Sequence, residues 1–337
     1  MQKYYIKTAK TALILVYLVI IAGALVRMTG SGMGCPDWPK CFGYYIPPTD
    51  IKQLLWQPQH QYLENQVIIK DEKLYVAVGN FKTQTTFDPT QWRPYTKHDY
   101  AIFNAKHTWI EYLNRLAGAL AGIVVFLMAV CSFGFWKTNK KVTIWSWITV
   151  ILMGFQGWLG AKVVYSVLNP IKITLHTFVA LLIVAVMLSA IDAAKKQVFQ
   201  HENNILFNKI LILSIFLTLI QIILGTQVRQ FVDDQIKMLG YDQMHIILEH
   251  PTITFYIHRT LSMLVLFSTI YLYIQNKSFA VQLKLVNWIM LAVVFEALSG
   301  IIITYLHFPF ASQPIHLVFA SVLFGLQYQL AIQLIKK

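Results

Sequence analysis

Apolar and polar positions alternate in long blocks along most of this chain. Eight apolar runs carry few charges, and each is at least 20 residues long. Because about 20 apolar residues in a helix span a ~30 Å hydrocarbon core, the pattern predicts eight transmembrane helices. The runs cover residues 9–28, 109–136, 143–165, 171–191, 205–228, 255–275, 283–306 and 313–334.

The composition fits an all-α polytopic membrane protein. Hydrophobic residues make up 56% of the 337 residues, and charged residues make up 13%. In soluble domains about a quarter of the residues are charged. The chain therefore belongs in the lipid bilayer.

The net charge of +13 raises the question of nucleic-acid binding, but the lysines gather in alternate loops instead of one patch. Loops rich in lysine mark the cytoplasmic side of a membrane protein. We therefore predict that both termini are cytoplasmic and that nucleic acid is not a partner. The lysines on this side are Lys3, Lys7, Lys10, Lys137, Lys140, Lys141, Lys195, Lys196, Lys209, Lys277, Lys284, Lys336 and Lys337.

The first apolar run has the features of a secretory signal peptide, but an internal match argues that it is retained. Residues 23–27 (GALVR) recur as residues 225–229 (GTQVR) at the end of the fifth run. A segment that is removed after export is not expected to match an internal one. The N-terminus also lacks an Arg- and Ser-rich transit peptide, which favours the bacterial plasma (inner) membrane.

Four matches in the same order indicate that the chain contains two copies of one unit. We predict two four-helix bundles of the same orientation, related by an axis along the membrane normal, with residues 1–195 as the first and 196–337 as the second. The separations from helix 2 to helix 4 and from helix 6 to helix 8 are 62 and 58 residues. The matched pairs are residues 23–27 with 225–229, Asn114-Arg115 with His258-Arg259, residues 155–160 (FQGWLG) with 295–300 (FEALSG), and His176 with His316.

A long polar segment, roughly residues 29–107, distinguishes the first half. It lies outside the membrane and is too long for a plain connection, so we expect it to be folded or functional. Cys35 and Cys41 can form a disulfide on this oxidising side, and a metal-binding pair is the alternative. Alternating residues within 64–82 predict a short hairpin. The third cysteine, Cys131, is interpreted as an inert thiol inside the membrane.

Asn114 and three histidines are placed in the outer half of the membrane by the predicted topology. A single histidine in an apolar helix is more often a hydrogen-bonded core residue than a metal ligand. Here His258 and His316 occupy matched positions on paired helices, and His176 repeats the second. Histidines on facing helices of a bundle are typical haem ligands, and no Cys/His cluster has the spacing of a zinc site.

The arginines support a haem site further. Only five occur, and four of them stand at matched outer helix ends. Guanidinium groups bind carboxylates with two hydrogen bonds, so these arginines are candidates for the haem propionates. The alternative is that they reach to the membrane interface as ordinary basic side chains. The four are Arg27, Arg115, Arg229 and Arg259.

Two carboxylates fall within predicted helices, where ionisable residues are costly and usually functional. Glu111 lies three residues before Asn114 and shares its helix face, so we interpret it as a proton donor or acceptor. Glu296 lies in the middle of helix 7, where the other half has the neutral Gln156. For Glu296 a proton-transfer role and a structural hydrogen bond stay open.

Taken together, these residues resemble those of the haem A synthase family, whose members oxidise a methyl group of haem O to the formyl group of haem A. The resemblance covers all eight predicted helices. It rests on residues 23–27 followed by Gly30-Ser31-Gly32, residues 34–39 (GCPDWP), the Glu111 to Arg115 stretch, His176, His258-Arg259 and His316.

The resemblance implies an oxidoreductase of haem A biosynthesis, which serves cytochrome oxidase assembly. It implies a haem b whose iron is held by His258 and His316, a substrate haem O site around Glu111 and His176, and a disulfide between Cys35 and Cys41. Expected partners are haem O synthase, a quinone or another electron acceptor, and the lipid bilayer. A homo-oligomer stays open.

The chain departs from the family at Asn114, where relatives usually have histidine. An amide is a poor iron ligand, so His176 alone is expected to hold the substrate haem, with Asn114 beside it. His107, His60 and His98 are the other candidates for the missing ligand. A second cysteine pair, found in some relatives, is absent from the sequence.

Two other functions compete with a synthase. A di-haem b electron-transfer protein would have six-coordinate iron in both halves, whereas only the second half here has a histidine pair. A transporter built on repeats would have Gly- or Pro-broken helices near the membrane midplane, whereas the polar residues here gather at the outer edge. The sequence favours the synthase.

Overall fold

A computed structural model describes residues 2–98, 100–195 and 204–335. Lys196, Lys336 and Lys337 of the lysine pattern lie outside these residues. The predicted boundary between the two repeats, after residue 195, also falls at the edge of the described part.

Eight helices of the described chain are long and apolar enough to cross a membrane, which confirms the prediction. They correspond one to one with the apolar runs of the sequence. Their bounds are α1 Gln2–Met28, α2 Ala105–Ser132, α3 Lys140–Tyr165, α4 Pro170–Ala194, α5 Ile205–Leu239, α6 Ile253–Ser278, α7 Lys284–Tyr305 and α8 Ser312–Ile335.

The α2 and α5 helices extend beyond their apolar runs, and each of these two extensions has a local polar cause. The α2 helix begins before residue 109 because the Asn104 side chain accepts a hydrogen bond from the backbone N–H of His107, which caps the helix. The α5 helix continues past residue 228, where Arg229 and Asp233 form an ion pair one turn apart. Such pairs stabilise a helix that has left the hydrocarbon core.

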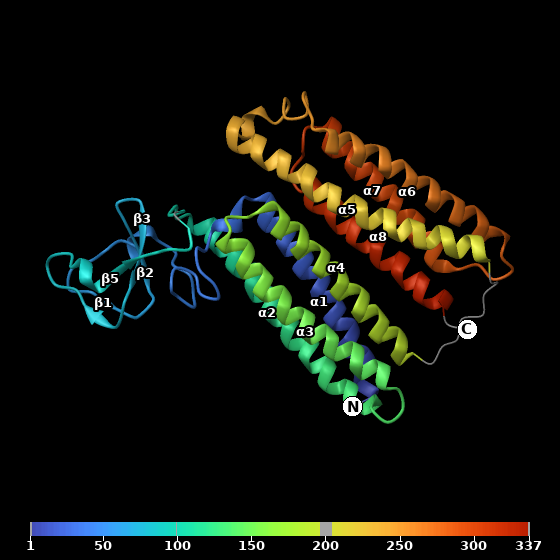
Figure 1. Cartoon of the computed structure of the whole chain (residues 1–337), viewed down its shortest axis with the longest axis horizontal. Helices are drawn as coiled ribbons and strands as arrows, with labels where there is room; N and C mark the ends of the chain where they lie inside the picture. The colour runs from blue at the N-terminus through green and yellow to red at the C-terminus, as the bar shows by residue number, and fades with distance from the viewer. Residues whose placement is uncertain (1, 99, 196–203, 336–337) are drawn as a thin grey trace.

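The helices lie in two groups, α1–α4 and α5–α8 (Figure 1). Sequential helices pack as antiparallel pairs within each group, and α1, α4, α5 and α8 make the contacts between the groups. Each group buries its own apolar cluster, which includes Met128 and Met187 in the first and Leu272 and Ile289 in the second. The symmetry that would relate the two groups as repeats stays a prediction.

The lysine-rich ends of the helices lie at one end of the molecule, and the segment between α1 and α2 projects from the other (Figure 1). That segment forms a small β-domain. Its hairpin of β2 and β3 pairs Val67 with Val76, which confirms the hairpin predicted within residues 64–82. The strands are β1 Gln61–Tyr62, β2 Val67–Lys70, β3 Lys73–Ala77, β4 Phe81–Lys82 and β5 Trp92–Pro94.

The β-domain has more sheet than the sequence indicated. The β5 strand extends the hairpin into a three-stranded sheet, and β1 pairs with β4 separately. These strands have only two or three residues each, too few to show an alternating pattern. They are held by packing instead, since the Trp92 ring lies edge-on to Tyr62 and Phe81, with centroids 4.9 and 5.3 Å away.

Candidate functional site

His258 and His316 come from α6 and α8 and face one another. They lie five and four residues after the first residue of their helices, so they share a depth at the end of the bundle that carries the β-domain. The centroids of the two imidazole rings are 6.4 Å apart, and the ring planes meet at 79°. The structure therefore brings together the two residues that the sequence singled out as a ligand pair.

Each histidine ring of the predicted sites lies against a glycine of the neighbouring helix. A Cβ on Gly225 would lie 3.3 Å from Cε1 of His258, and one on Gly300 would lie 3.4 Å from Cε1 of His316. The same relation joins Gly160 to His176, at 3.5 Å. A side chain at Gly225 would press on the ring of His258, and one at Gly300 would touch that of His316, so these glycines leave room for the imidazoles.

Gly23 of α1 is the counterpart of Gly225 in the matched motifs, and it lies near Asn114. A Cβ on Gly23 would lie 4.0 Å from Oδ1 of Asn114. All four glycines fell within the matched motifs of the sequence, yet no role was assigned to them there. The available signal was that a glycine recurs at the same place in every odd-numbered helix.

Side chains of neighbouring helices also hold the histidines. Gln221 donates to the backbone carbonyl of His258 at 2.8 Å, and Gln156 donates to that of His176 at 3.0 Å. The Nδ1 atoms of these two histidines are buried and have no hydrogen-bond partner in the described part of the chain.

His316 differs from the other two histidines because its Nδ1 atom has partners. Ser299 Oγ lies 2.8 Å from it, and Glu296 Oε1 lies 3.2 Å from it. Glu296 and Ser299 belong to α7. The mid-membrane carboxylate that the sequence left without a partner thus faces a candidate iron ligand.

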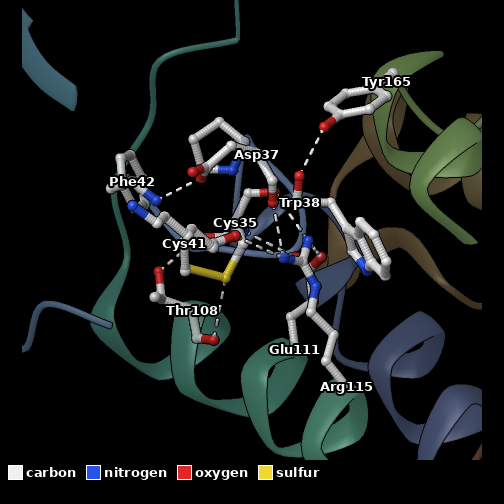
Figure 2. A network of polar contacts seen from close by, with 12 residues as sticks. Cys35, Asp37, Trp38, Cys41, Phe42, Thr108, Glu111, Arg115 and Tyr165 are labelled. Atoms are coloured by element: carbon white, nitrogen blue, oxygen red, sulfur yellow. Dashed lines mark hydrogen bonds and ion pairs between the residues drawn. A yellow bond between two sulfur atoms is a disulfide. The ribbon is translucent and has the colours of Figure 1, made fainter. Parts of the chain in front are cut away.

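Glu111 of the first half connects α2 to the start of the external segment (Figure 2). The residue is 4% exposed. Its Oε2 accepts a hydrogen bond from the backbone N–H of Cys35 at 2.8 Å, and its Oε1 accepts one from Arg115 at 2.5 Å. Both carboxylate oxygens therefore have protein partners, and a role for Glu111 in proton transfer stays a prediction.

Arg115 forms hydrogen bonds with the external segment as well as with Glu111. Its guanidinium donates to the backbone carbonyls of Asp37 at 2.7 Å, Lys40 at 2.9 Å and Cys35 at 3.4 Å (Figure 2). These bonds tie the loop to α2. Contact with a propionate was predicted for Arg115 from its position alone, and in the structure protein groups take up most of its donors.

Cys35 and Cys41 are joined by a disulfide, which confirms that prediction over the metal-binding alternative. The loop that it closes is fixed on both sides. Thr108 of α2 donates to the Gly34 carbonyl at 2.7 Å. Within the loop, the Asp37 carboxylate accepts from the backbone N–H groups of Phe42 and Gly43, and burial raises the pKa of this carboxyl.

We expect the disulfide to be detectable by counting free thiols. When the denatured protein is alkylated without reduction, only Cys131 should take the label, whereas all three cysteines should take it after reduction. Mass spectrometry of the intact chain measures this, and three labels without reductant would contradict the bridge. A bridge that closes so short a loop stabilises the fold by about 2–3 kcal/mol.

Arg27 and Arg229 meet at one carboxylate between the two helix groups. Asp233 of α5 pairs with Arg27 of α1 at 3.0 Å and with Arg229 at 2.7 Å, one arginine on each oxygen. Arg259, by contrast, is exposed, and no ion pair of its side chain is found among the described residues. Of the four arginines considered for the propionates, Arg259 is thus the one that pairs with no carboxylate of the described residues.

Replacing Asp233 with asparagine should destabilise the contact between the groups. One amide oxygen can serve one arginine, but the amide nitrogen then faces the other guanidinium. A hydrogen bond to a charged group contributes about 1.5–3 kcal/mol, and we expect a loss of this order in the free energy of unfolding, measured by circular dichroism in detergent.

Asp234→Asn is the matched control for this variant. Asp234 is the next residue, its side chain is 51% exposed, and its nearest cation, Lys237, is 3.9 Å away. Exposed pairs of this kind contribute little, so the control should unfold like the parent. An equal loss of unfolding free energy in the two variants would show that Asp233 does not specifically stabilise the contact between the helix groups.

Asn114 has a buried Oδ1 atom with no hydrogen-bond partner in the described ranges. The three histidines considered as replacements are placed elsewhere. His107 lies in the first turn of α2, seven residues and roughly 10 Å along the helix from Asn114. His98 bonds to the Pro36 carbonyl at 3.0 Å, and His60 packs on Tyr62.

Comparisons with known proteins agree with the resemblance noted from the motifs. A protein of Wolbachia pipientis wMel named "Heme A synthase" is 26% identical to this chain, over 93% of this chain and 87% of its own length. Its namesake from Wolbachia pipientis subsp. Culex pipiens is also 26% identical, over 93% and 92%. A third, from Shewanella oneidensis, is 27% identical over 50% of this chain and 38% of its own length.

A family profile covers most of the chain. Residues 8–85 and 80–328 match the COX15-CtaA profile, which describes a cytochrome oxidase assembly protein. The two matches together include six complete helices, α2 to α7, the greater part of α1 and α8, and the β-domain. The protein therefore belongs to the COX15-CtaA family of cytochrome oxidase assembly proteins.

Proposed function

We propose that this protein is a haem A synthase, which oxidises a methyl group of haem O to the formyl group of haem A. The observation that carries the proposal is the pair of facing imidazoles, His258 and His316, in a chain that matches proteins of that name over nearly its whole length. Because the oxidation releases electrons, a quinone or a redox protein is the expected acceptor.

The second half has a donor set that suits a resident haem b. Metal–imidazole bonds are about 2 Å long, so two rings on opposite sides of one ion have centres about 6 Å apart; the observed separation is 6.4 Å. No group of three or more His, Cys, Asp or Glu residues in the described ranges is arranged to hold a bare metal ion. Two histidines suffice for haem iron, because the porphyrin supplies its other four ligands.

His258 and His316 would hold this haem, and Gly225 and Gly300 leave room for their rings. When bound, a six-coordinate haem supplies one-electron transfer. Arg259 follows His258 directly and is exposed, which makes it the best candidate for a propionate contact. Arg27 and Arg229 would keep the two halves together through Asp233.

The first half is the proposed substrate site for haem O. His176 would bind the substrate iron; its ring lies beside Gly160, and its backbone carbonyl accepts a hydrogen bond from Gln156. Asn114 would serve as a hydrogen-bond partner, because an amide is a poor iron ligand. Glu111 would donate or accept a proton during oxidation of the methyl carbon.

The two halves are proposed to differ in chemistry, which separates a synthase from a di-haem electron-transfer protein. A protein that only transfers electrons gains from two histidines at each iron, and the first half has Asn114 in place of one.

We place the protein in the bacterial plasma membrane with both termini in the cytoplasm, because its lysines gather in alternate loops. Haem O synthase is the expected source of its substrate.

The experiment that tests the proposal is extraction and chromatography of haem from cells with and without the gene. We expect haem A only with the gene, and accumulated haem O without it. An absorption spectrum of the purified protein tests the resident haem separately, since the absence of a Soret band would exclude every haem-based function. Equal haem A in both cell lines would overturn the synthase.

Replacing the two polar residues of the first half should have unequal effects. We expect His176→Ala to abolish haem A formation while the b-type spectrum of the second half persists. Asn114→Ala should be milder, because Asn114 is expected to support the substrate and not to bind its iron. Haem A per cell and the spectrum of each variant measure this, and an Asn114→Ala effect as large as that of His176→Ala would contradict the assignment.

A further inference from the structure

Two side chains of α7 contact the same nitrogen of His316. Ser299 Oγ lies 2.8 Å from Nδ1, and Glu296 Oε1 lies 3.2 Å from it. The two residues are three positions apart and so lie on one face of the helix. The Nδ1 atom of His258, the facing ring, has no such partner among the described residues. The two imidazoles of the pair are therefore held in unequal surroundings.

The contacts of Ser299 favour one of the two tautomers of His316. The Ser299 hydroxyl donates its one hydrogen to the backbone carbonyl of Glu296 at 2.9 Å. A hydroxyl has only one hydrogen to donate, so toward His316 its oxygen accepts. In this arrangement Nδ1 of His316 donates to Ser299, which leaves the lone pair of Nε2 free for a metal.

Glu296 is an unusual residue for its position. Its side chain is 20% exposed within a helix that spans the membrane, where a carboxylate is costly and usually functional. In the other half, the matched Gln156 bonds to the backbone of His176 and not to its ring. The carboxylate of α7 instead lies next to the ring, with its Oε1 3.2 Å from Nδ1 of His316.

We propose that Ser299 and Glu296 are positioning residues that orient and polarise His316 as an axial ligand, giving the second-half haem one strong and one weak imidazole donor. The inference rests on the proposed function, in which His258 and His316 hold that haem. Hydrogen bonds from a ligating histidine to such outer partners fix its tautomer and raise its basicity. A more basic ligand stabilises ferric over ferrous iron, so the pair lowers the reduction potential of the site.

The test uses the full-length protein, purified with its haem in detergent, and four variants. Ser299→Ala removes the hydroxyl, Ser299→Thr keeps it, and Glu296→Gln replaces the carboxyl group with an amide of nearly the same size. Ser268→Ala is the matched control, because Ser268 is a part-buried serine of α6 that bonds to Ser214 and Val265. Two quantities are measured: the reduction potential by spectroelectrochemistry, and the rate of haem transfer to apomyoglobin.

We expect the potential to rise in Ser299→Ala and Glu296→Gln, and haem to be released about 10–100-fold faster, the usual effect of losing an outer partner of a metal ligand. Ser299→Thr and Ser268→Ala should match the parent in both measurements. If Ser299→Ala lost its haem altogether, retention by Ser299→Thr would still attribute the loss to the hydroxyl.

Two results would overturn the inference while leaving the proposed function intact. One is a parent-like potential in haem-loaded Ser299→Ala and Glu296→Gln. The other is an equal change in Ser299→Ala and Ser299→Thr, which would show that side-chain size and not the hydroxyl matters. A parent protein without any b-type spectrum would instead contradict the proposed function itself, and the inference with it.

Discussion

Purified protein in which His258 or His316 is replaced by alanine is expected to lose the stable, low-spin b-type spectrum of the parent. The centroids of the two rings are 6.4 Å apart, so the two imidazoles are expected to bind the same iron. Removing one leaves an open coordination position, and removing both should leave no haem in the second half. Absorption spectra and a haem assay of the purified variants measure the loss.

His250→Ala is the control for this experiment. His250 is exposed and lies only eight residues before His258, outside the α6 helix. Its replacement makes the same chemical change without touching the ring pair, so the spectrum should be that of the parent. A double variant of His258 and His316 with an unchanged spectrum would show that the iron is held elsewhere.

Glu111→Gln is expected to bind haem yet accumulate haem O or a hydroxylated intermediate. Glutamine has nearly the size of glutamate but cannot exchange a proton near neutral pH. Loss of haem A should therefore be large, while the haem b of the second half stays bound. Chromatography of extracted haem measures the products, and parent-level haem A in this variant would show that Glu111 is structural.

The hydrogen bonds of Glu111 require a control that separates chemistry from loop attachment. Glutamine also weakens the bonds that Glu111 accepts from Cys35 and Arg115. Thr108→Val breaks another bond between α2 and the same loop, the one to the Gly34 carbonyl, and leaves the carboxylate in place. Equal losses of haem A in both variants would mean that the loop, and not a proton on Glu111, is what activity requires.

The sequence alone determined the elements that depend on local pattern. The length of an apolar run decides whether a helix crosses the membrane, so eight runs predicted eight helices. Alternating residues around Val67 and Val76 predicted the external hairpin, because successive side chains of a strand point to opposite faces. Repetition of short motifs pointed to His258 and His316 together, because equivalent positions in two copies of a unit have equivalent depth.

Only the tertiary structure decided which groups those residues meet. Arg27 and Arg229 are candidates for propionate contacts by position, and the structure adds that both pair with Asp233. The bond that ties Arg27 to Asp233 spans 206 residues of sequence, and no periodicity indicates such a partner. In the same way Arg115 binds loop carbonyls, whose availability depends on how the disulfide loop folds over α2.

Glu296 shows most clearly what the sequence determines and what only the tertiary structure decides. The sequence identified it as a carboxylate within a membrane helix, which is costly enough to require a reason. Its partner became known only when α7 and α8 were packed, because that packing brings its Oε1 to 3.2 Å from Nδ1 of His316. Hydrophobic length is a property of each segment by itself, whereas a hydrogen bond needs two segments at a fixed rotation and depth, and only the packed bundle sets these.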